Sequence, residues 1–167
     1  MNLSPHFTLE ELSLSDTATR LGIDNAPPAD IVVNLKLLAS GLELVRSTLG
    51  GPLHINSGYR CEALERVLCE KDFVGWCGRH GKDRRAPGSW SEYFARKGHP
   101  RGFCADFVCR SFGTPAKIVD KIRKTTIKFD QLIMEGTWVH VSFAPEMRMM
   151  AMTATFTNGT PTFTNLA

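Results

Sequence analysis

Residues 97–107, KGHPRGFCADF, and residues 138–142, WVHVS, decide the predicted fold of this chain. Pro100 and Gly102 disfavour a helix in the first stretch, so we predict a turn followed by a strand that ends near Cys109. The second stretch is apolar and rich in residues that favour strands. The polar residues in and beside these two strands are therefore the first candidates for a functional site.

Two histidines and an aspartate stand out there. His99 precedes the first strand, Asp106 lies within it, and His140 lies in the middle of the second. Two imidazoles and one carboxylate are a ligand set for Zn²⁺ that leaves a fourth position for water. A histidine or an aspartate taken alone more often has a structural role, so the rest of the chain must support this prediction.

Helical signals fill the N-terminal part of the chain. Thr8 followed by Glu11 is a capping box, and Ser15 predicts the start of a second short helix that Gly22 ends. Residues 29–48 predict the longest helix, because apolar residues recur there at helical spacing. The residues expected to face the core are Ile31, Leu35, Leu38, Leu42, Val45 and Leu49.

The middle of the chain is less regular. Residues 53–57 alternate like a strand, and residues 61–71 predict a helix. The expected apolar stripe of this helix is Leu64, Val67 and Leu68. Residues 72–97 lack clear periodicity, and we predict a long insertion that its aromatic residues order in part, because long structureless loops are uncommon in compact domains. Further on, Thr114 caps another predicted helix.

Strand signals return near the C-terminus. Residues 129–135 and 138–143 predict two strands, joined by a two-residue loop at Gly136 and Thr137. A last hairpin is predicted over residues 153–164, with Asn158-Gly159 as its turn. The fold class that follows is α+β, with N-terminal helices and an antiparallel sheet that carries the site.

The short loop also fixes a register. Glu135 should lie opposite Trp138, and Ile133 opposite His140, so that Glu135 and His140 share one face of the sheet. Glu135 is then diagonal to His140, with roughly 7–8 Å between their backbones. That places its carboxylate beside a zinc-bound water, so we predict Glu135 as the general base and expect Asp130 to point to the other face.

Four stretches of the chain together resemble the M15 family of zinc D-Ala-D-Ala peptidases. The site pattern is His99-x2-Gly102-x-Cys104-x-Asp106, followed by residues 138–142. The other two stretches are residues 7–25 and residues 55–60, INSGYR. The branch that these stretches look most like is that of the small peptidases of phages and prophages. The resemblance covers most of the chain in the family's order.

The resemblance implies a Hedgehog/DD-peptidase-like fold and a Zn²⁺ cofactor held by His99, Asp106 and His140. Arg60 follows the Ser-Gly-Tyr turn and is implied to polarise the scissile carbonyl, because a fixed guanidinium stabilises a developing oxyanion. The candidate substrate-binding residues are Ser57, Tyr59 and Trp138.

Three features depart from the pattern of the relatives. The link before the first metal histidine is long here and short and glycine-rich in the relatives. Lys97 stands two positions before His99, where the relatives usually have serine. Thr137 stands three positions before His140, where many relatives carry the catalytic base, and for this reason Glu135 is the candidate.

The function implied is that of a zinc-dependent peptidase that cleaves the stem peptides of peptidoglycan, as a D,D-carboxypeptidase or an endopeptidase. The phage-like branch implies an endolysin or a virion-associated murein hydrolase. Two other classes stay open. One is a non-catalytic cell-wall-binding or virion structural protein that retains the fold. The other is a nucleic-acid-binding protein that uses the basic insertion.

Length and hydropathy favour one domain over residues 1–167. No apolar run approaches the roughly 18–20 residues that span a membrane. The first residues lack the basic and apolar regions of a secretory signal. We therefore expect synthesis in a host cytoplasm and action on the cell wall after release.

Cysteine number and charge set further limits. Five cysteines cannot all pair within one chain, so we expect reduced thiols. Cys69, Cys77 and His80 are a candidate second zinc site, but their spacing matches no compact ligand motif. The net charge of +3 is small. The basic residues of the chain gather in the insertion. We expect a monomer that contacts anionic cell-wall polymer and no specific nucleic acid.

Overall fold

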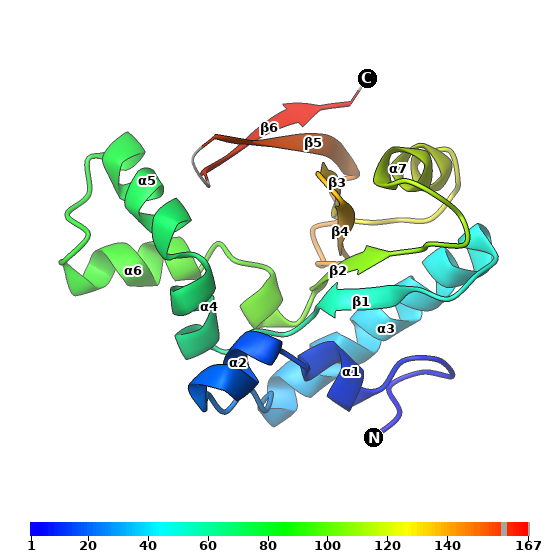
Figure 1. Ribbon diagram of the computed structural model, residues 1–167, viewed down its shortest axis with the longest axis horizontal. Coiled ribbons are helices and arrows are strands. Elements are labelled where there is room, and N and C mark those ends of the chain that lie inside the picture. Colours follow the sequence, from blue (N-terminus) through cyan, green and yellow to red (C-terminus); the bar gives the residue numbers. More distant parts are fainter. Residues whose placement is uncertain (158–159, 167) are drawn as a thin grey trace.

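The structure is a computed structural model, and it describes residues 1–157 and 160–166. Helices dominate the first part of the chain and strands the second, as the α+β prediction requires (Figure 1). The helices are α1 (Leu9–Ser13), α2 (Asp16–Leu21), α3 (Ala29–Leu49), α4 (Glu62–Leu68), α5 (Glu70–His80), α6 (Pro87–Phe94), the short 3₁₀ helix η1 (His99–Arg101) and α7 (Pro115–Arg123). The strands are β1 (His54–Ser57), β2 (Cys104–Val108), β3 (Gln131–Glu135), β4 (Trp138–Ser142), β5 (Met150–Thr157) and β6 (Thr160–Asn165).

The predicted helix caps are confirmed. The Thr8 side chain accepts a hydrogen bond from the Glu11 amide, and that of Ser15 accepts one from the Ala18 amide. Gly22 ends α2 in the left-handed conformation, with φ of 65°. The predicted apolar face of α3 is buried except for Ile31, which is half-buried at the start of the helix.

The six strands form one sheet in the order β1-β2-β4-β3-β5-β6. All neighbours are antiparallel except β3 and β5, which are parallel. The expectation of a purely antiparallel sheet was therefore wrong. Strand β4 already has β2 and β3 on its two sides, and β5 pairs with the remaining edge of β3. Because β4 ends beside the start of β3, the chain starts β5 there and runs in the same direction as β3.

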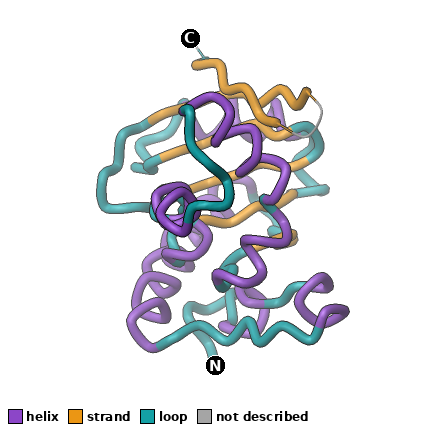
Figure 2. Tube along the Cα trace, turned by 90° about the vertical axis from the view of Figure 1, so that its left-hand side faces the viewer, coloured by secondary structure: helices purple, strands orange, loops and turns teal. Residues whose placement is uncertain are grey.

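The two faces of the sheet have different partners. Leu132, Val139 and Val141 belong to the main core, which includes residues of α3 and α7. The opposite face carries Asp106 and His140, and helices α4 to α6 lie on that side in both views (Figures 1 and 2). Asp106 and His140, two of the candidate site residues, therefore lie on the sheet face turned toward these helices.

The insertion predicted at residues 72–97 contains two helices, α5 and α6, and is therefore more regular than the partial order that its aromatic residues predicted. Helices α5 and α6 pack through a second core of Phe73, Trp76, Cys77, Trp90 and Tyr93. The apolar positions 73, 76 and 77, and 90, 93 and 94, do follow helical spacing. Each run is too short to stand out from the glycines and charges that separate the helices.

The final hairpin pairs β5 with β6 in antiparallel register, as predicted. Its predicted turn, Asn158-Gly159, lies outside the described residues. Helix α5 contacts β6, so the insertion also meets the last strand. All five cysteines are free thiols. None of the helices in the described part of the chain is long and apolar enough to cross a membrane.

Candidate metal centre

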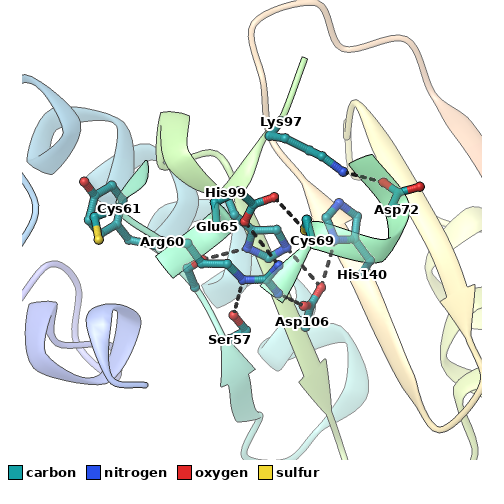
Figure 3. Close-up of polar contacts among 12 residues, drawn as sticks. Ser57, Arg60, Cys61, Glu65, Cys69, Asp72, Lys97, His99, Asp106 and His140 are labelled. Carbon is teal, nitrogen blue, oxygen red and sulfur yellow. Dashed lines mark hydrogen bonds and ion pairs between the residues drawn. The ribbon is translucent and has the colours of Figure 1, made fainter. Parts of the chain in front are cut away.

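His99, Asp106 and His140 converge on the sheet face that lies beneath α4 to α6 (Figure 3). Asp106 of β2 and His140 of β4 are direct cross-strand partners, and η1 brings His99 to them from the turn before β2. One nitrogen or oxygen atom from each side chain lies within 4.8 Å of the others, and all three residues are buried. Within the described residues this is the one such group of histidine, cysteine or acidic side chains.

The ring of His99 is held by a backbone carbonyl. Its Nδ1 lies 2.7 Å from the carbonyl oxygen of Gly58. A carbonyl can only accept, so Nδ1 carries the hydrogen and Nε2 keeps its lone pair. Nε2 faces Asp106, 3.4 Å from Oδ1. The orientation of His99 is therefore that of a histidine prepared to bind a metal through Nε2.

The Ser-Gly-Tyr turn that supplies this carbonyl is pressed against α1. A Cβ at Gly58 would lie 2.3 Å from the carbonyl oxygen of Leu12, so the position requires glycine. The next amide, of Tyr59, donates to the same Leu12 oxygen at 2.6 Å. The Tyr59 side chain is buried in the main core. Tyr59 is 7% exposed, so most of its side chain packs in the core.

Both oxygens of Asp106 are engaged. Oδ1 accepts from His140 Nδ1 at 2.8 Å, and Oδ2 accepts from Arg60 Nη2 at 2.8 Å. Arg60 Nε in turn donates to Ser57 Oγ at 2.8 Å. Arg60 and Ser57 thus form one hydrogen-bonded chain that ends on the Asp106 carboxylate. The sequence prediction assigned Arg60 to the scissile carbonyl and Ser57 to substrate binding, and it missed this contact.

Sequence reasoning also missed Glu65. Of the stripe predicted for this helix, Leu64 is buried as expected, but Val67 and Leu68 are exposed. Glu65 is buried instead. Glu65 Oε2 lies 3.5 Å from Arg60 Nη1, and its Oε1 accepts from the Cys69 thiol at 3.1 Å. No sequence pattern indicates that Glu65 is buried. Its burial depends on the charge of Arg60, and only the fold brings that charge beside it.

Burial and charge act in opposite directions on the acid–base groups of the cluster. Burial raises the pKa of Asp106, but the neighbouring His99 and His140 outweigh it and hold that pKa well below its usual value. Burial lowers the pKa of His99, and the Arg60 charge lowers it further. Burial also lowers the pKa of His140, but Cys104 and Asp106 raise it well above its usual value. Asp106 is thus ionised, and His99 is in its neutral, ligand form.

The hairpin register predicted for Glu135 is confirmed. Glu135 pairs with Trp138, and Ile133 pairs with His140. The Trp138 indole Nε1 donates to Glu135 Oε2 at 3.0 Å, and both residues are half-buried. Asp130 lies before β3, where Arg148 binds both of its oxygens, at 2.7 Å through Nε and 2.6 Å through Nη2.

Lys97 joins the insertion to the turn that carries His99. Its Nζ lies 2.9 Å from Asp72 Oδ2 and 4.2 Å from the centre of the Tyr93 ring. The Tyr93 hydroxyl donates to the same carboxylate oxygen at 2.5 Å. Figure 3 shows the Lys97–Asp72 pair beside the cluster. Lys97 therefore anchors α5 and α6 at the edge of the cluster.

The fold and the site define an α+β protein with a buried His₂Asp cluster of the metal-binding kind. The family model described as Peptidase M15 matches residues 5–69, so the N-terminal part of the chain is similar to that family. The match contains the Ser-Gly-Tyr-Arg turn and Glu65 and ends before His99. No curated protein and no solved structure matches the chain. The family match supports a peptidase, and the His₂Asp cluster can bind a metal ion.

Proposed function

We propose that the protein is a zinc-dependent peptidase that cleaves the stem peptides of peptidoglycan, as a D,D-carboxypeptidase or an endopeptidase. The observation that carries this proposal is the convergence of His99, Asp106 and His140 on one sheet face. The M15 family match adds support for peptidase chemistry. We further propose that it acts as a phage endolysin, made in the host cytoplasm and acting on the wall after release.

The residues of the cluster fit zinc by their chemistry. Imidazole nitrogens and a carboxylate oxygen are the ligands that catalytic zinc sites use, and three protein ligands leave one position open. The hydrogen bond from His99 Nδ1 to the Gly58 carbonyl leaves Nε2 available to bind the ion. Arg60 holds Asp106 through Oδ2, so Oδ1 is the oxygen that would face the ion. His99, Asp106 and His140 would therefore hold the ion. Zinc bound there would supply Lewis acidity toward a peptide carbonyl and a water of lowered pKa.

Glu135 and Arg60 are the proposed catalytic residues. Glu135 shares the sheet face of the cluster through its pairing with Trp138, and its carboxylate would take a proton from the attacking water and pass it to the leaving amine. The Arg60 guanidinium would stabilise negative charge that develops on the carbonyl oxygen. Trp138 would position Glu135 by its hydrogen bond to one carboxylate oxygen. Ser57 would position Arg60 in the same way.

The substrate class can be tested with purified sacculi. The parent protein should release muropeptides, a chelator should stop the release, and added zinc should restore it. Mass spectrometry of the fragments would identify the bond that is cut. His140→Ala should lose bound metal and activity together, whereas His54→Ala, an exposed histidine of β1 outside the cluster, should keep both. Full zinc content in His140→Ala would contradict the ligand assignment.

A second candidate is a non-catalytic cell-wall-binding or virion structural protein. The burial of all three cluster residues favours it, because a hydrolase needs access for its substrate. Such a protein would sediment with sacculi and release no fragment with or without zinc. The sacculus experiment therefore separates the two candidates.

A further inference from the structure

A buried carboxylate stands behind the His₂Asp cluster, and no step of the proposed reaction uses it. Glu65 is 1% exposed. Its charged partner is Arg60, 3.5 Å away, and the Cys69 thiol donates to its other oxygen. Burying an ionised carboxylate is costly unless a charge and hydrogen bonds compensate it. The position of Glu65 therefore needs an explanation in the charge balance of the site.

The Arg60 guanidinium lies between two carboxylates. Nη2 binds Asp106 at 2.8 Å, and Nη1 faces Glu65 at 3.5 Å. With Asp106 alone, Arg60 would form a neutral pair, and the carboxylate would bring no net charge toward a divalent cation. Glu65 adds a second negative charge, so that the three side chains together are negative. This arrangement favours a cation at the cluster.

The same contacts also fix the guanidinium in space. Its Nε, Nη1 and Nη2 each have a different partner, namely Ser57, Glu65 and Asp106. A planar group held on three sides cannot rotate (Figure 3). Asp106 Oδ2 is therefore held in place, and Oδ1 stays directed at the two histidines.

We infer that Glu65 is a positioning residue for the metal, which acts through Arg60 on Asp106. The inference rests on the proposed zinc site. Glu65 keeps the guanidinium oriented and offsets its charge, and both effects strengthen the binding of a divalent cation by His99, Asp106 and His140. Groups that orient metal ligands typically change metal affinity by about 10–100-fold when they are removed.

The test compares two substitutions in the same helix. Glu65→Gln keeps the size and one acceptor oxygen and removes the charge. Glu62→Gln is the matched control, because the Glu62 carboxylate accepts from the Trp90 indole at 2.7 Å, away from the cluster. Zinc affinity, measured by competition with a chromophoric chelator, should fall by about 10–100-fold in Glu65→Gln. Glu62→Gln should match the parent.

Glu65→Asp adds a second variant, which keeps the charge and shortens the reach to Arg60. It should lose affinity, but less than Glu65→Gln. If Glu65→Gln does not fold, Glu65→Asp decides the question, and parental affinity in this variant overturns the inference.

The unfolding midpoint of each variant in chelator separates positioning from packing. A lower midpoint with parental zinc affinity would make Glu65 a structural residue only and would overturn the inference while the zinc site stands. If the parent protein binds no zinc, the proposed function and this inference fail together.

Discussion

At the scale of single residues, two carboxylates at opposite ends of β3 have different surroundings. Glu135 is half-buried on the face of the cluster and has the Trp138 indole as its hydrogen-bond partner. Asp130 is almost fully buried and is bound at both oxygens by Arg148. A carboxylate with a neutral partner can accept a proton, whereas one paired with arginine is held as an anion. These surroundings agree with the proposed role of Glu135 in proton transfer and with a stabilising role for Asp130.

We predict that Glu135→Gln keeps its zinc and its fold and loses activity. Glutamine retains the size and an acceptor for Trp138 but cannot take a proton. The turnover rate on sacculi should fall by about 10²–10⁴-fold, the usual contribution of a general base. Zinc content and the unfolding midpoint serve as internal controls. Activity close to that of the parent would show that another group accepts the proton.

We predict that Asp130→Asn lowers the free energy of unfolding by about 1–3 kcal/mol near neutral pH. Hydrogen bonds from Arg148 lower the pKa of Asp130 below the usual 3.8, against the opposing effect of burial. The stabilisation is thus complete above the pKa of the unfolded chain, about 3.9, and is lost as the pH falls through the lower folded value.

Urea unfolding of parent and variant across a pH series measures this effect. The difference between them should be constant from about pH 5 to 7 and should shrink in more acidic solution. Asp120→Asn is the control, because the exposed pair of Asp120 with Lys124 should contribute about 0.5 kcal/mol or less. A difference that grows as the pH falls would contradict the prediction.

At the scale of elements, short turns place the site residues. The turn after β1 supplies the Gly58 carbonyl that orients His99, and it also starts the segment that carries Arg60. Helices α5 and α6 are joined to the turn of His99 through Lys97 and Asp72. Each connection links a segment remote in sequence to one of the cluster residues.

We predict that Gly58→Ala damages both stability and metal binding. The added Cβ would lie 2.3 Å from the Leu12 carbonyl oxygen, so the turn must shift and the acceptor of His99 must move with it. The cost should be about 1–3 kcal/mol, the scale of a forced packing change. Gly78→Ala in α5, where the new Cβ meets nothing within 4 Å, is the control. Denaturant unfolding and zinc titration measure the two effects, and parental zinc affinity in Gly58→Ala would contradict the link to His99.

We also predict that the insertion contributes to binding of the wall and not to cleavage. Arg84 and Arg85 are exposed between α5 and α6. Their joint change to glutamine should weaken sedimentation with sacculi and reduce its salt dependence. Hydrolysis of a short soluble stem peptide should not change. The same change at Lys117 and Lys121, exposed on α7, is the control, and equal loss on both substrates would instead make the segment part of the fold.

At the scale of the whole molecule, the proposed metal would join three separate segments. η1, β2 and β4 each contribute one residue to the cluster. A ligand that binds only the folded state stabilises it in proportion to the logarithm of its concentration. The proposed zinc site should therefore appear in the stability of the whole protein.

We predict that free zinc at about 100 times its dissociation constant stabilises the protein by about 2.7 kcal/mol. For a chain of this size this corresponds to a rise in the unfolding midpoint of about 5–10 °C. Calorimetry with zinc and with chelator measures the shift. His140→Ala should melt at the same temperature under both conditions. An equal midpoint for the parent under both conditions would contradict the presence of a tight site.

The sequence by itself determined the features that depend on neighbouring residues. The caps at Thr8 and Ser15 follow from side chains that reach amides three residues away. The register of β3 with β4 follows from a two-residue loop, because a loop of that length leaves one pairing. The same alternation indicated that Glu135 and His140 share a face.

Only the tertiary structure decided the features that depend on remote partners. The parallel pairing of β3 with β5 depends on which strand edge is still free. Arg60 binds Asp106, and Glu65 is buried behind it, because packing brings together charges that have no fixed spacing in the chain. Sequence periodicity records which side of an element faces the core, whereas the partner of a buried charge is set by the assembled fold.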